Sequence, residues 1–362
     1  MQITLVNDDA PLGKSEATRA ITAWADSLQS RGHDVTVIQP DLQGVQLATS
    51  PGTYLVPAIP LPGSAGRLLS LPTHTQLEPL VARADVVHTF QPGPLGQWAH
   101  RVARANQVPA VYSTHPRHAG PHAPTLDSSL LEHAGRANLV TSPSQQFATR
   151  LRPHVATPIH PLCFPQRFGP ITNQPGIMRR NLAIDDRATV ALMVGPAYGG
   201  EVVQALERAL GQLPDAVILG VSLGPVEPLL RRAAVLGQWG HQLRFRSAVS
   251  DDDMAALYAA ASFLIASESP HPSALGEAQA AGLPTLAFMG TVAADELSPK
   301  TGIVVPAEAE SVRSALCHLI DDPIHRAELG EAARSQADRF SLSSTTDRLL
   351  DLYALARRLT AA

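Results

Sequence analysis

Lysine is almost absent from this chain of 362 residues: only Lys14 and Lys300 occur, and arginine supplies the rest of the basic charge. The formal net charge is −4 at pH 7, so the composition lacks the basic surplus of a nucleic-acid-binding protein. Cysteine is scarce as well. Cys163 and Cys317 lie too far apart for a metal-binding motif or a disulfide framework. We therefore expect two reduced thiols in a cytoplasmic protein without a nucleic-acid partner.

Long apolar runs are also missing. No stretch approaches the roughly 20 residues that a bilayer-spanning helix needs, so the sequence predicts no transmembrane segment. The first apolar strand is not preceded by the basic and apolar regions of a signal peptide, which favours a cytoplasmic location. Peripheral contact with the inner face of the membrane stays an open alternative.

The sequence does contain a repeated alternation of short apolar strands with helical stretches. Apolar residues make up 44% of the chain and its length predicts two domains. The strands that we expect lie at 3–6, 34–38, 85–88, 109–112, 138–140, 189–194, 216–221, 242–246, 263–265 and 284–288. Such alternation is typical of parallel sheets with helices on both faces, so we predict an α/β fold of two doubly wound, Rossmann-like domains that face a central cleft.

A proline-rich stretch separates the two runs of alternation. Residues 152–175 contain six prolines, which exclude a regular helix and a central strand. We therefore predict an N-terminal domain over 1–152, a linker over 153–175 and a C-terminal domain over 176–340. A helix over 341–362 ends the chain, and packing of this helix back on the first domain is left open.

The turn after strand 263–265 is the most informative segment for function, because ligands of open α/β sheets bind beyond the carboxyl ends of the strands. A polar loop leads there into a helix, whose N-terminus presents unpaired amides and a partial positive charge suited to a phosphate. Glu277, about one turn into this helix, could accept hydrogen bonds from a sugar or ribose diol. The spacing alone is equally consistent with no functional role for either glutamate. Glu277 would then be a solvated helix residue and Glu268 an ordinary charge in the loop.

From Ser267 to Pro284, and again at 302–306, the sequence resembles the signature of the retaining glycosyltransferases of family 4, which have the GT-B fold. The family pattern is a serine, a first glutamate, a glycine-rich turn, a second glutamate followed by alanine, and Gly-x-Pro. Further stretches resemble the family in the same order along the chain: 31–37, 85–88, 112–115, 141–144, 321–323, 329–334 and 339–341. The resemblance covers nearly the whole chain.

This resemblance implies transfer of a sugar from a nucleotide-diphosphate donor to an acceptor, with retention at the anomeric carbon. The enzyme would be of hexosyltransferase type, with no metal and no cofactor. The first domain would be the acceptor side and the second would bind the nucleotide sugar. The acceptor, whether a lipid, a glycan or a small molecule, is not identified.

The resemblance also assigns roles in the second domain. Glu277 would hold the ribose of the donor, and Glu268 would contact the donor sugar as a catalytic residue. The amides around Ser273, Ala274 and Leu275 would face the diphosphate.

In the first domain, the resemblance places His115 near the transferred sugar as the second catalytic residue. Gly13 and Lys14, in the loop after the first strand, would lie near the donor phosphates. His88, at the end of a strand, is interpreted as a structural histidine.

The sequence departs from the family where charge matters most. The family ends the first strand of its second domain in Val-Gly-Arg and places a lysine five residues further on. Here these two positions hold Pro196 and Glu201. Loss of one such donor typically raises a barrier by about 2.7–4 kcal/mol, so another cation would have to compensate. The cations considered for this are Lys14, Arg231, Arg232 and Arg244.

These departures keep three hypotheses open. The first is an active transferase with a rearranged phosphate site. The second is a catalytically degenerate GT-B protein that acts as a binding module or as the partner subunit of an active glycosyltransferase. The third is another GT-B or doubly wound enzyme, such as a sugar-nucleotide epimerase or a phosphorylase-like protein. A dinucleotide oxidoreductase is disfavoured, because no strand is followed by Gly-x-Gly-x-x-Gly.

Overall fold

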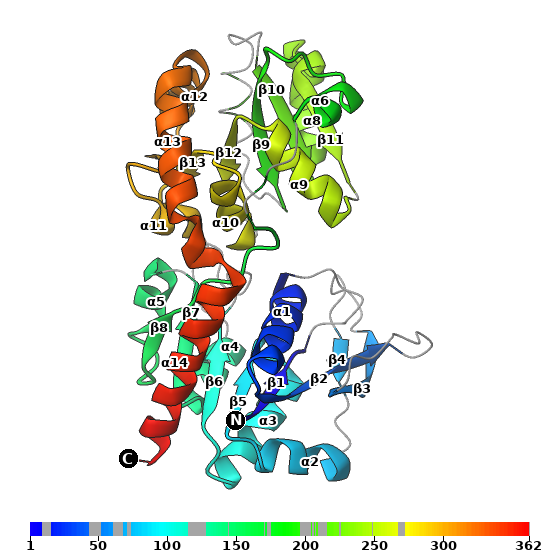
Figure 1. The fold of residues 1–362 in the computed structure, drawn as a ribbon, viewed down its shortest axis with the longest axis vertical. Helices are drawn as coiled ribbons and strands as arrows, with labels where there is room; N and C mark the ends of the chain where they lie inside the picture. The colour runs from blue at the N-terminus through cyan, green and yellow to red at the C-terminus, as the bar shows by residue number, and fades with distance from the viewer. Residues whose placement is uncertain are drawn as a thin grey trace. The chain divides into compact units, whose positions relative to one another are not determined.

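The computed structural model describes residues 1–8, 16–42, 52–60, 68–70, 74–114, 128–143, 145–169, 171, 175–195, 204, 206, 208, 216–223, 226–247, 249–266 and 272–361. The chain divides into two compact units (Figure 1). Unit 1 comprises Met1–Pro165 and Leu342–Ala362, and unit 2 comprises Gln166–Ser341. The break after Pro165 falls inside the proline-rich stretch.

Unit 1 is built on an eight-stranded sheet in the order β4-β3-β2-β1-β5-β6-β7-β8. Its strands are β1 (Gln2–Val6), β2 (Asp34–Leu42), β3 (Thr53–Pro60), β4 (Leu68–Ser70), β5 (Val86–Thr89), β6 (Ala110–Ser113), β7 (Leu139–Ser142) and β8 (Ile159–Pro161). Neighbouring strands pair in parallel, except for the antiparallel pair β3–β4. The strand order reverses between β1 and β5, so the topological switch point of unit 1 lies at their carboxyl ends.

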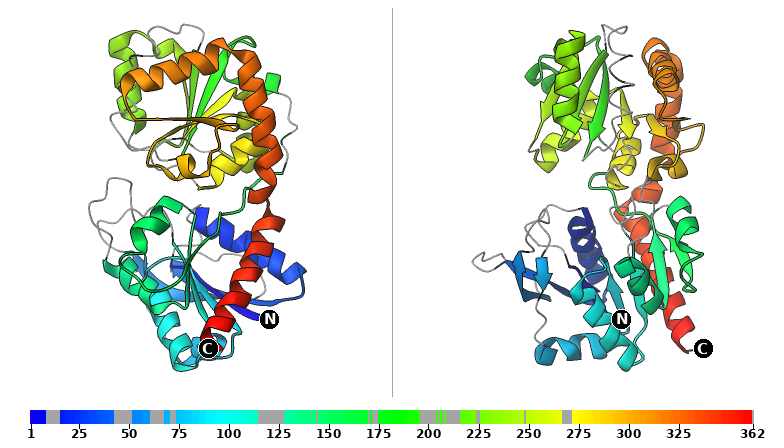
Figure 2. Two further views of the ribbon diagram at one scale, coloured as in Figure 1. Left: turned by 90° about the vertical axis from the view of Figure 1, so that its left-hand side faces the viewer. Right: turned by 180° about the vertical axis from the view of Figure 1, so that it is seen from behind.

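Helices cover both faces of this sheet (Figure 2). They are α1 (Glu16–Ser30), α2 (His74–Ala82), α3 (Pro94–Ala105), α4 (Ser128–Arg136), α5 (Gln145–Leu151) and α14 (Leu342–Ala361). Successive side chains of a strand point to opposite faces. Leu5 accordingly packs with Trp24 of α1 and Leu352 of α14, whereas Val6 packs on the other face with Trp98 of α3.

The last helix, α14, is part of the core of unit 1. The indole N–H of Trp24 donates a hydrogen bond to Oγ1 of Thr345 over 3.3 Å. At the end of α1, the Arg31 guanidinium forms an ion pair with Asp347. The strand–helix alternation of unit 1 is thus completed by a segment that begins at Leu342, after the whole of unit 2.

Unit 2 contains a six-stranded sheet in the order β11-β10-β9-β12-β13-β14, and its strand pairs are parallel. The strands are β9 (Thr189–Val194), β10 (Ala216–Val221), β11 (Leu243–Arg246), β12 (Phe263–Ala266), β13 (Thr285–Phe288) and β14 (Gly302–Val305). The order reverses between β9 and β12, which places the switch point of unit 2 at the carboxyl ends of these two strands.

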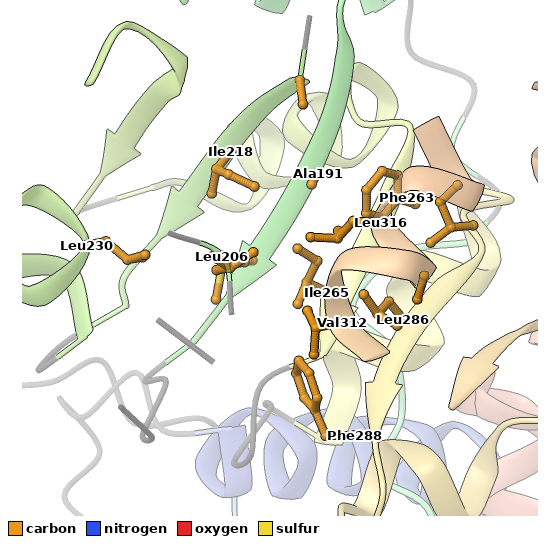
Figure 3. Close-up of a cluster of buried hydrophobic side chains, with 14 of the residues drawn as sticks. Ala191, Leu206, Ile218, Leu230, Phe263, Ile265, Leu286, Phe288, Val312 and Leu316 are labelled. Carbon is orange, nitrogen blue, oxygen red and sulfur yellow. The ribbon is translucent and has the colours of Figure 1, made fainter. Parts of the chain in front are cut away.

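The helices of unit 2 also lie on both faces of its sheet. They are α6 (Pro175–Asn181), α8 (Val226–Gly237), α9 (Asp251–Ala260), α10 (Pro272–Ala280), α11 (Val292–Glu296), α12 (Ala309–Asp321) and α13 (Pro323–Gln336), with 3₁₀ turns η2 (Gly240–Gln242) and η3 (Ala337–Phe340). Figure 3 shows one face, where Phe263 of β12 lies beside Leu316 of α12, in the same buried cluster as Ile218 of β10. On the other face Leu264 packs with Ala278 of α10.

The predicted fold class is confirmed, because both sheets are doubly wound and largely parallel. The sequence analysis missed β3, β4, β8 and β14, and for two of these strands, β3 and β8, the physical cause is evident. β3 contains Pro57 and Pro60, and β8 contains Pro161, and proline is disfavoured inside a sheet. β8 escapes this penalty because it is an edge strand. Among the described residues, no helix combines the length and the apolar composition that a bilayer crossing requires.

Candidate functional site

The candidate site lies where the switch point of unit 2 meets the first turn of α10. β12 leads towards this helix through residues 267–271, which lie outside the described residues, as does the predicted catalytic Glu268. Ser273, Ala274 and Leu275 form the first turn of α10, and their side chains are buried. They have no residue four positions back within the helix, so their N–H groups are the ones that helix geometry leaves for a loop or a ligand.

Glu277 is completely buried in the second turn of α10, so the alternative of a solvated helix residue is wrong. Its carboxylate forms a two-pronged ion pair with Arg167. Nε of Arg167 donates to Oε1 over 2.6 Å, and Nη2 donates to Oε2 over 2.8 Å. Paired, parallel hydrogen bonds of this kind are the strongest form of contact between a guanidinium and a carboxylate.

The remaining arm of the guanidinium points to a second carboxylate. Nη1 of Arg167 donates to Oδ1 of Asp251, in the first turn of α9, over 3.2 Å. The Asp251 side chain is 67% exposed, whereas that of Arg167 is 17% exposed. Burial on its own lowers the pKa of the Arg167 guanidinium, but the hydrogen bonds and the charge of Glu277 outweigh it and raise the pKa. Arg167 therefore stays charged.

Contacts on either side of Arg167 fix its place in unit 2. The backbone N–H of Gln166 donates to the carbonyl of Phe340 over 2.8 Å. Phe168 packs against the core beside Tyr258, with their ring centroids 6.5 Å apart. The Arg167 guanidinium also lies 5.0 Å from the ring centroid of Phe168. Nothing in the sequence marks Arg167 as a functional residue. It lies 110 positions from Glu277, in the proline-rich stretch that the sequence predicts to be a linker.

Close backbone approaches hold α10 in position. A Cβ on Gly276 would lie 2.7 Å from Cβ of Phe340, and a Cβ on Gly330 of α13 would lie 2.3 Å from the carbonyl oxygen of Gly282. Gly282 itself has φ +73°, the left-handed region that glycine adopts without strain. Side chains at these positions would push α10 away from α13, and Glu277 with it.

Two residues at the same edge of the sheet have a positive φ. Gly195, after β9, has φ 87°, and Ser222, after β10, has φ 53°. The Ser222 N–H donates to the carbonyl of Arg246 over 2.8 Å, which holds this residue in place. Of the four described non-glycine residues with positive φ, Ser222 is the one at this edge.

Two of the cations considered as substitutes for the missing diphosphate charges have other partners. The Arg244 guanidinium donates to several carbonyls, among them those of Leu182 and His241. Arg231 pairs with Glu227 on its own helix and lies 4.2 Å from the ring centroid of Phe245. Lys14, Pro196 and Glu201 lie outside the described residues.

In unit 1, the predicted residues Gly13, Lys14 and His115 also lie outside the described residues. The structure does show how the loop that carries Lys14 begins. The Asp8 carboxylate, just beyond β1, accepts hydrogen bonds from the N–H groups of Leu95 and Gly96, both over 2.9 Å. These amides belong to the first turn of α3, where a carboxylate is stabilised by the helix dipole. Asp8 thereby fixes the start of the loop at the switch point of unit 1.

His88 is buried in unit 1 and acts as a structural residue, as the sequence analysis interprets it. Its Nδ1 shares a hydrogen bond with the Tyr353 hydroxyl over 2.9 Å, and its Nε2 shares one with the Ser113 hydroxyl over 2.7 Å. Nearby, the Thr89 hydroxyl shares hydrogen bonds with His100 and His133 over 3.0 and 2.8 Å. Burial lowers the pKa of His88 to about 3 and that of His100 to about 4, so both rings are neutral at pH 7.

No group of three or more metal-ligating side chains occurs among the described residues. The polar clusters of the two units are therefore a neutral histidine and hydroxyl network in unit 1 and a charged pair at α10 in unit 2. Both clusters lie near the carboxyl ends of strands, where doubly wound proteins bind ligands, since Thr89 ends β5 and Ser113 ends β6, but among these described residues only the second contains an ion pair.

Comparison with known proteins first defines a class. Over 98% of its length the chain resembles sucrose-phosphate synthase from Thermosynechococcus elongatus, with a TM-score of 0.75, 17% identity and 99% of that chain covered. It resembles Anabaena HepE in complex with UDP-glucose with a TM-score of 0.74 and 17% identity, over 98% of this chain and 100% of the other. These likenesses show a GT-B fold.

The family follows from sequence. Residues 17–162 match the model of glycosyltransferase family 4, and residues 192–322 match the model of the glycosyl transferases group 1. The two models together span most of the chain, in the order that the family resemblance predicts. The chain is thus a glycosyltransferase of the family 4 type.

Two curated relatives agree with this. The chain is 27% identical, over 268 residues, to the GDP-mannose-dependent monoacylated alpha-(1-6)-phosphatidylinositol monomannoside mannosyltransferase of Corynebacterium glutamicum, which covers 68% of this chain and 69% of the relative. It is 33% identical, over 203 residues, to the D-inositol 3-phosphate glycosyltransferase of Salinispora tropica. The second match spans 50% of this chain and 41% of that relative.

Proposed function

We propose that this protein transfers a hexose from a nucleotide-diphosphate donor to an acceptor, with retention at the anomeric carbon. The observation that carries the proposal is the buried Arg167–Glu277 pair on α10, at the switch point of a unit whose sequence matches the group 1 transferases. A doubly wound unit binds its ligand at this point. Glu277 is the ribose-binding residue in this proposal, and the first turn of α10 binds the diphosphate.

The remaining site residues keep the roles that the family resemblance gives them. In the proposal, Glu268 orients the donor sugar, His115 assists transfer, and Gly13 and Lys14 lie near the donor phosphates. No metal or cofactor takes part. Lys14 and Arg232 remain as the cations proposed to compensate for Pro196 and Glu201, because Arg231 and Arg244 have partners inside unit 2.

The acceptor is proposed from the relatives. The name of one curated relative contains phosphatidylinositol monomannoside, and that of the other contains D-inositol 3-phosphate. Both acceptors carry an inositol ring and a phosphate. We therefore propose an acceptor of this chemistry. GDP-mannose is the first donor to test, because the name of one of the two relatives includes it.

The test is a transfer assay with the purified full-length chain. GDP-mannose, UDP-glucose and UDP-N-acetylglucosamine are each offered with phosphatidylinositol mannoside in vesicles and with free inositol phosphate. We expect product with one of the donors. The Glu277→Gln variant should transfer the sugar at least about 100-fold more slowly. NMR of the product should show the same anomeric configuration as in the donor. Product of inverted configuration would contradict retention.

A second function has its own observation in favour. Arg231 and Arg244 are both tied to other groups, so neither is free to replace the two family cations whose positions hold Pro196 and Glu201. A catalytically degenerate protein that binds a nucleotide and assists a partner transferase fits this. It predicts nucleotide binding by calorimetry without turnover, and turnover only when a second transferase is added.

A further inference from the structure

The Arg167–Glu277 pair fixes the direction of the Glu277 carboxylate. Nε and Nη2 of the guanidinium meet both carboxylate oxygens, at 2.6 and 2.8 Å, so a rotation of the carboxylate would lose one of the hydrogen bonds. Each carboxylate oxygen can accept two hydrogen bonds. Among the described residues, the pair with Arg167 uses one position on each oxygen, which leaves a ligand with two adjacent donors a matching position on each.

Arg167 is itself held rigidly, as a positioning group has to be. The residue before it is tied to η3 by the 2.8 Å hydrogen bond from the Gln166 N–H to the carbonyl of Phe340. The residue after it, Phe168, packs against the core of unit 2. Because the chain is anchored on both sides of Arg167, the side chain starts from a fixed point and can orient its partner.

The surroundings argue against a direct contact of Arg167 with phosphate. All three arms of its guanidinium are engaged, two with Glu277 and one with Asp251. One positive group faces two negative ones, so the cluster has no surplus positive charge to attract a diphosphate. Arg167 consequently acts through Glu277.

We propose that Arg167 is a positioning residue for donor recognition: it orients Glu277 so that the free positions on the two carboxylate oxygens receive the adjacent 2′ and 3′ hydroxyls of the donor ribose. This inference rests on the proposed function. Glu277 has no exposed surface, so the ribose reaches it only when the residues that cover it move. The ion pair keeps the carboxylate compensated and oriented while they do so.

The test compares ribose with deoxyribose. Dissociation constants of GDP, 2′-deoxy-GDP and 3′-deoxy-GDP are measured by calorimetry for the wild type, Arg167→Lys, Arg167→Met and Glu277→Gln. UDP and its deoxy forms are used in the same way if GDP does not bind. The matched control is Arg180→Met, which removes an exposed arginine of α6 in the same unit. Circular dichroism and melting temperature report whether each variant folds.

The expected result is a preference of the wild type for GDP over each deoxy form of about tenfold or more, because each lost hydroxyl removes a hydrogen bond to a charged group. Arg167→Met brings this ratio close to one, and Arg167→Lys, which cannot form the two-pronged contact, gives an intermediate ratio. Arg180→Met keeps the wild-type ratio. A double variant Arg167→Met/Glu277→Gln loses no more selectivity than Glu277→Gln, since both residues act on one contact.

A purely structural role for Arg167 gives a different pattern. It lowers the melting temperature and weakens all three nucleotides equally, so an unchanged ratio in a folded Arg167→Lys or Arg167→Met overturns the inference. A wild type that turns over donor but does not distinguish ribose from deoxyribose overturns the inference and leaves the proposed function standing. A wild type that binds none of the nucleotides and makes no product overturns both.

Discussion

The two units bury polar side chains in opposite ways. In unit 1, His88 and His100 lie in a network of rings and hydroxyls, and both are neutral at pH 7 because burial lowers both pKa values. In unit 2, Arg167 and Glu277 are buried as ions. Neutral groups are buried at small cost when each has a hydrogen-bond partner, whereas an ion costs several kcal/mol unless its counter-ion meets it with good geometry.

This difference separates structure from function. A buried ion pair is often no more stable than the apolar packing that could replace it. In the proposed function the pair has another use, which is recognition of the donor at the switch point, where Glu277 lies beyond β12. The histidine network of unit 1 links β5 to β6 and α14, and its hydrogen bonds are directed into the core. It holds the fold together.

The largest effect is expected from breaking the ion pair. Arg167→Met leaves the fully buried Glu277 without its counter-charge, and we expect unit 2 to lose about 3–5 kcal/mol of unfolding free energy. The measurement is native-state hydrogen exchange of peptides from α10, with peptides from α3 in unit 1 as the internal reference.

The double variant Arg167→Met/Glu277→Leu is the control for this result. It removes both charges, so most of the lost stability should return. If the single variant costs less than about 1 kcal/mol, the carboxylate is not held as a buried ion, and the comparison between the units fails.

Acid should destabilise unit 1. Its folded state keeps His88 and His100 neutral down to pKa values of about 3 and 4, whereas the unfolded chain protonates both near pH 6.5. Their contribution is therefore complete above pH 6.5 and is lost as pH falls towards 4, at about 1.4 kcal/mol per pH unit and histidine. Between pH 7.5 and 5.5 we expect a loss of about 2–3 kcal/mol.

This acid dependence can be followed in unit 1 alone. Of the three tryptophans, Trp24 and Trp98 belong to unit 1 and Trp239 to unit 2. Urea unfolding of a Trp239→Phe variant, recorded by fluorescence at each pH, therefore reports unit 1. Adding His88→Gln should remove about half of the pH-dependent loss. A pH-independent midpoint would show that the buried histidines carry protons in the folded state.

Periodicity predicted most of the fold because the two sheets bury continuous apolar runs. β12 is apolar throughout, β10 is apolar apart from Gly220, and β9 is apolar from Val190 on. The residues of these strands alternate between two well-filled cores. β3 and β8 escaped because their proline content contradicts the strand signal. The helix at the end of the chain was predictable from the sequence. Its packing on β5 and β6 was not, because these contacts join residues that lie far apart in the sequence.

The site was predictable in part for the same reason. Glu277 and the turn of Ser273–Leu275 follow from a strand, a polar loop and a helix in direct succession. Arg167 does not, because nothing in its spacing relates it to a carboxylate 110 positions away. The alternative of a solvated Glu277 failed on the same point: a carboxylate in a helix looks exposed until its counter-ion is known.

A smaller effect is expected from the glycine that positions α10. Gly276→Ala adds a methyl group 2.7 Å from Cβ of Phe340, so the helix has to shift at a cost of about 1–3 kcal/mol. Gly135→Ala in α4 is the matched control, because nothing lies within 4 Å of the added methyl group. Replacing glycine by alanine inside this helix should stabilise unit 1 by about 0.5–1 kcal/mol. Thermal unfolding of both variants checks the opposite signs, and a Gly276→Ala variant as stable as the wild type contradicts the close approach.

The smallest effect is expected from an ion pair of the same chemistry at the surface. Arg231 and Glu227 pair over 2.8 Å on α8, but the Arg231 side chain is 58% exposed, so water screens the charges. Arg231→Gln should cost about 0.3–0.5 kcal/mol for the ion pair and about 0.5 kcal/mol more for the contact with the Phe245 ring. Urea unfolding in low and high salt measures the loss of unfolding free energy, and high salt should abolish the contribution of the ion pair.

The same salt change should leave the cost of Arg167→Met almost unaltered, because a buried pair is screened far less. Equal salt sensitivity in the two variants would mean that solvent reaches Glu277, and the contrast between buried and exposed charge would no longer explain why the chain keeps the pair at α10.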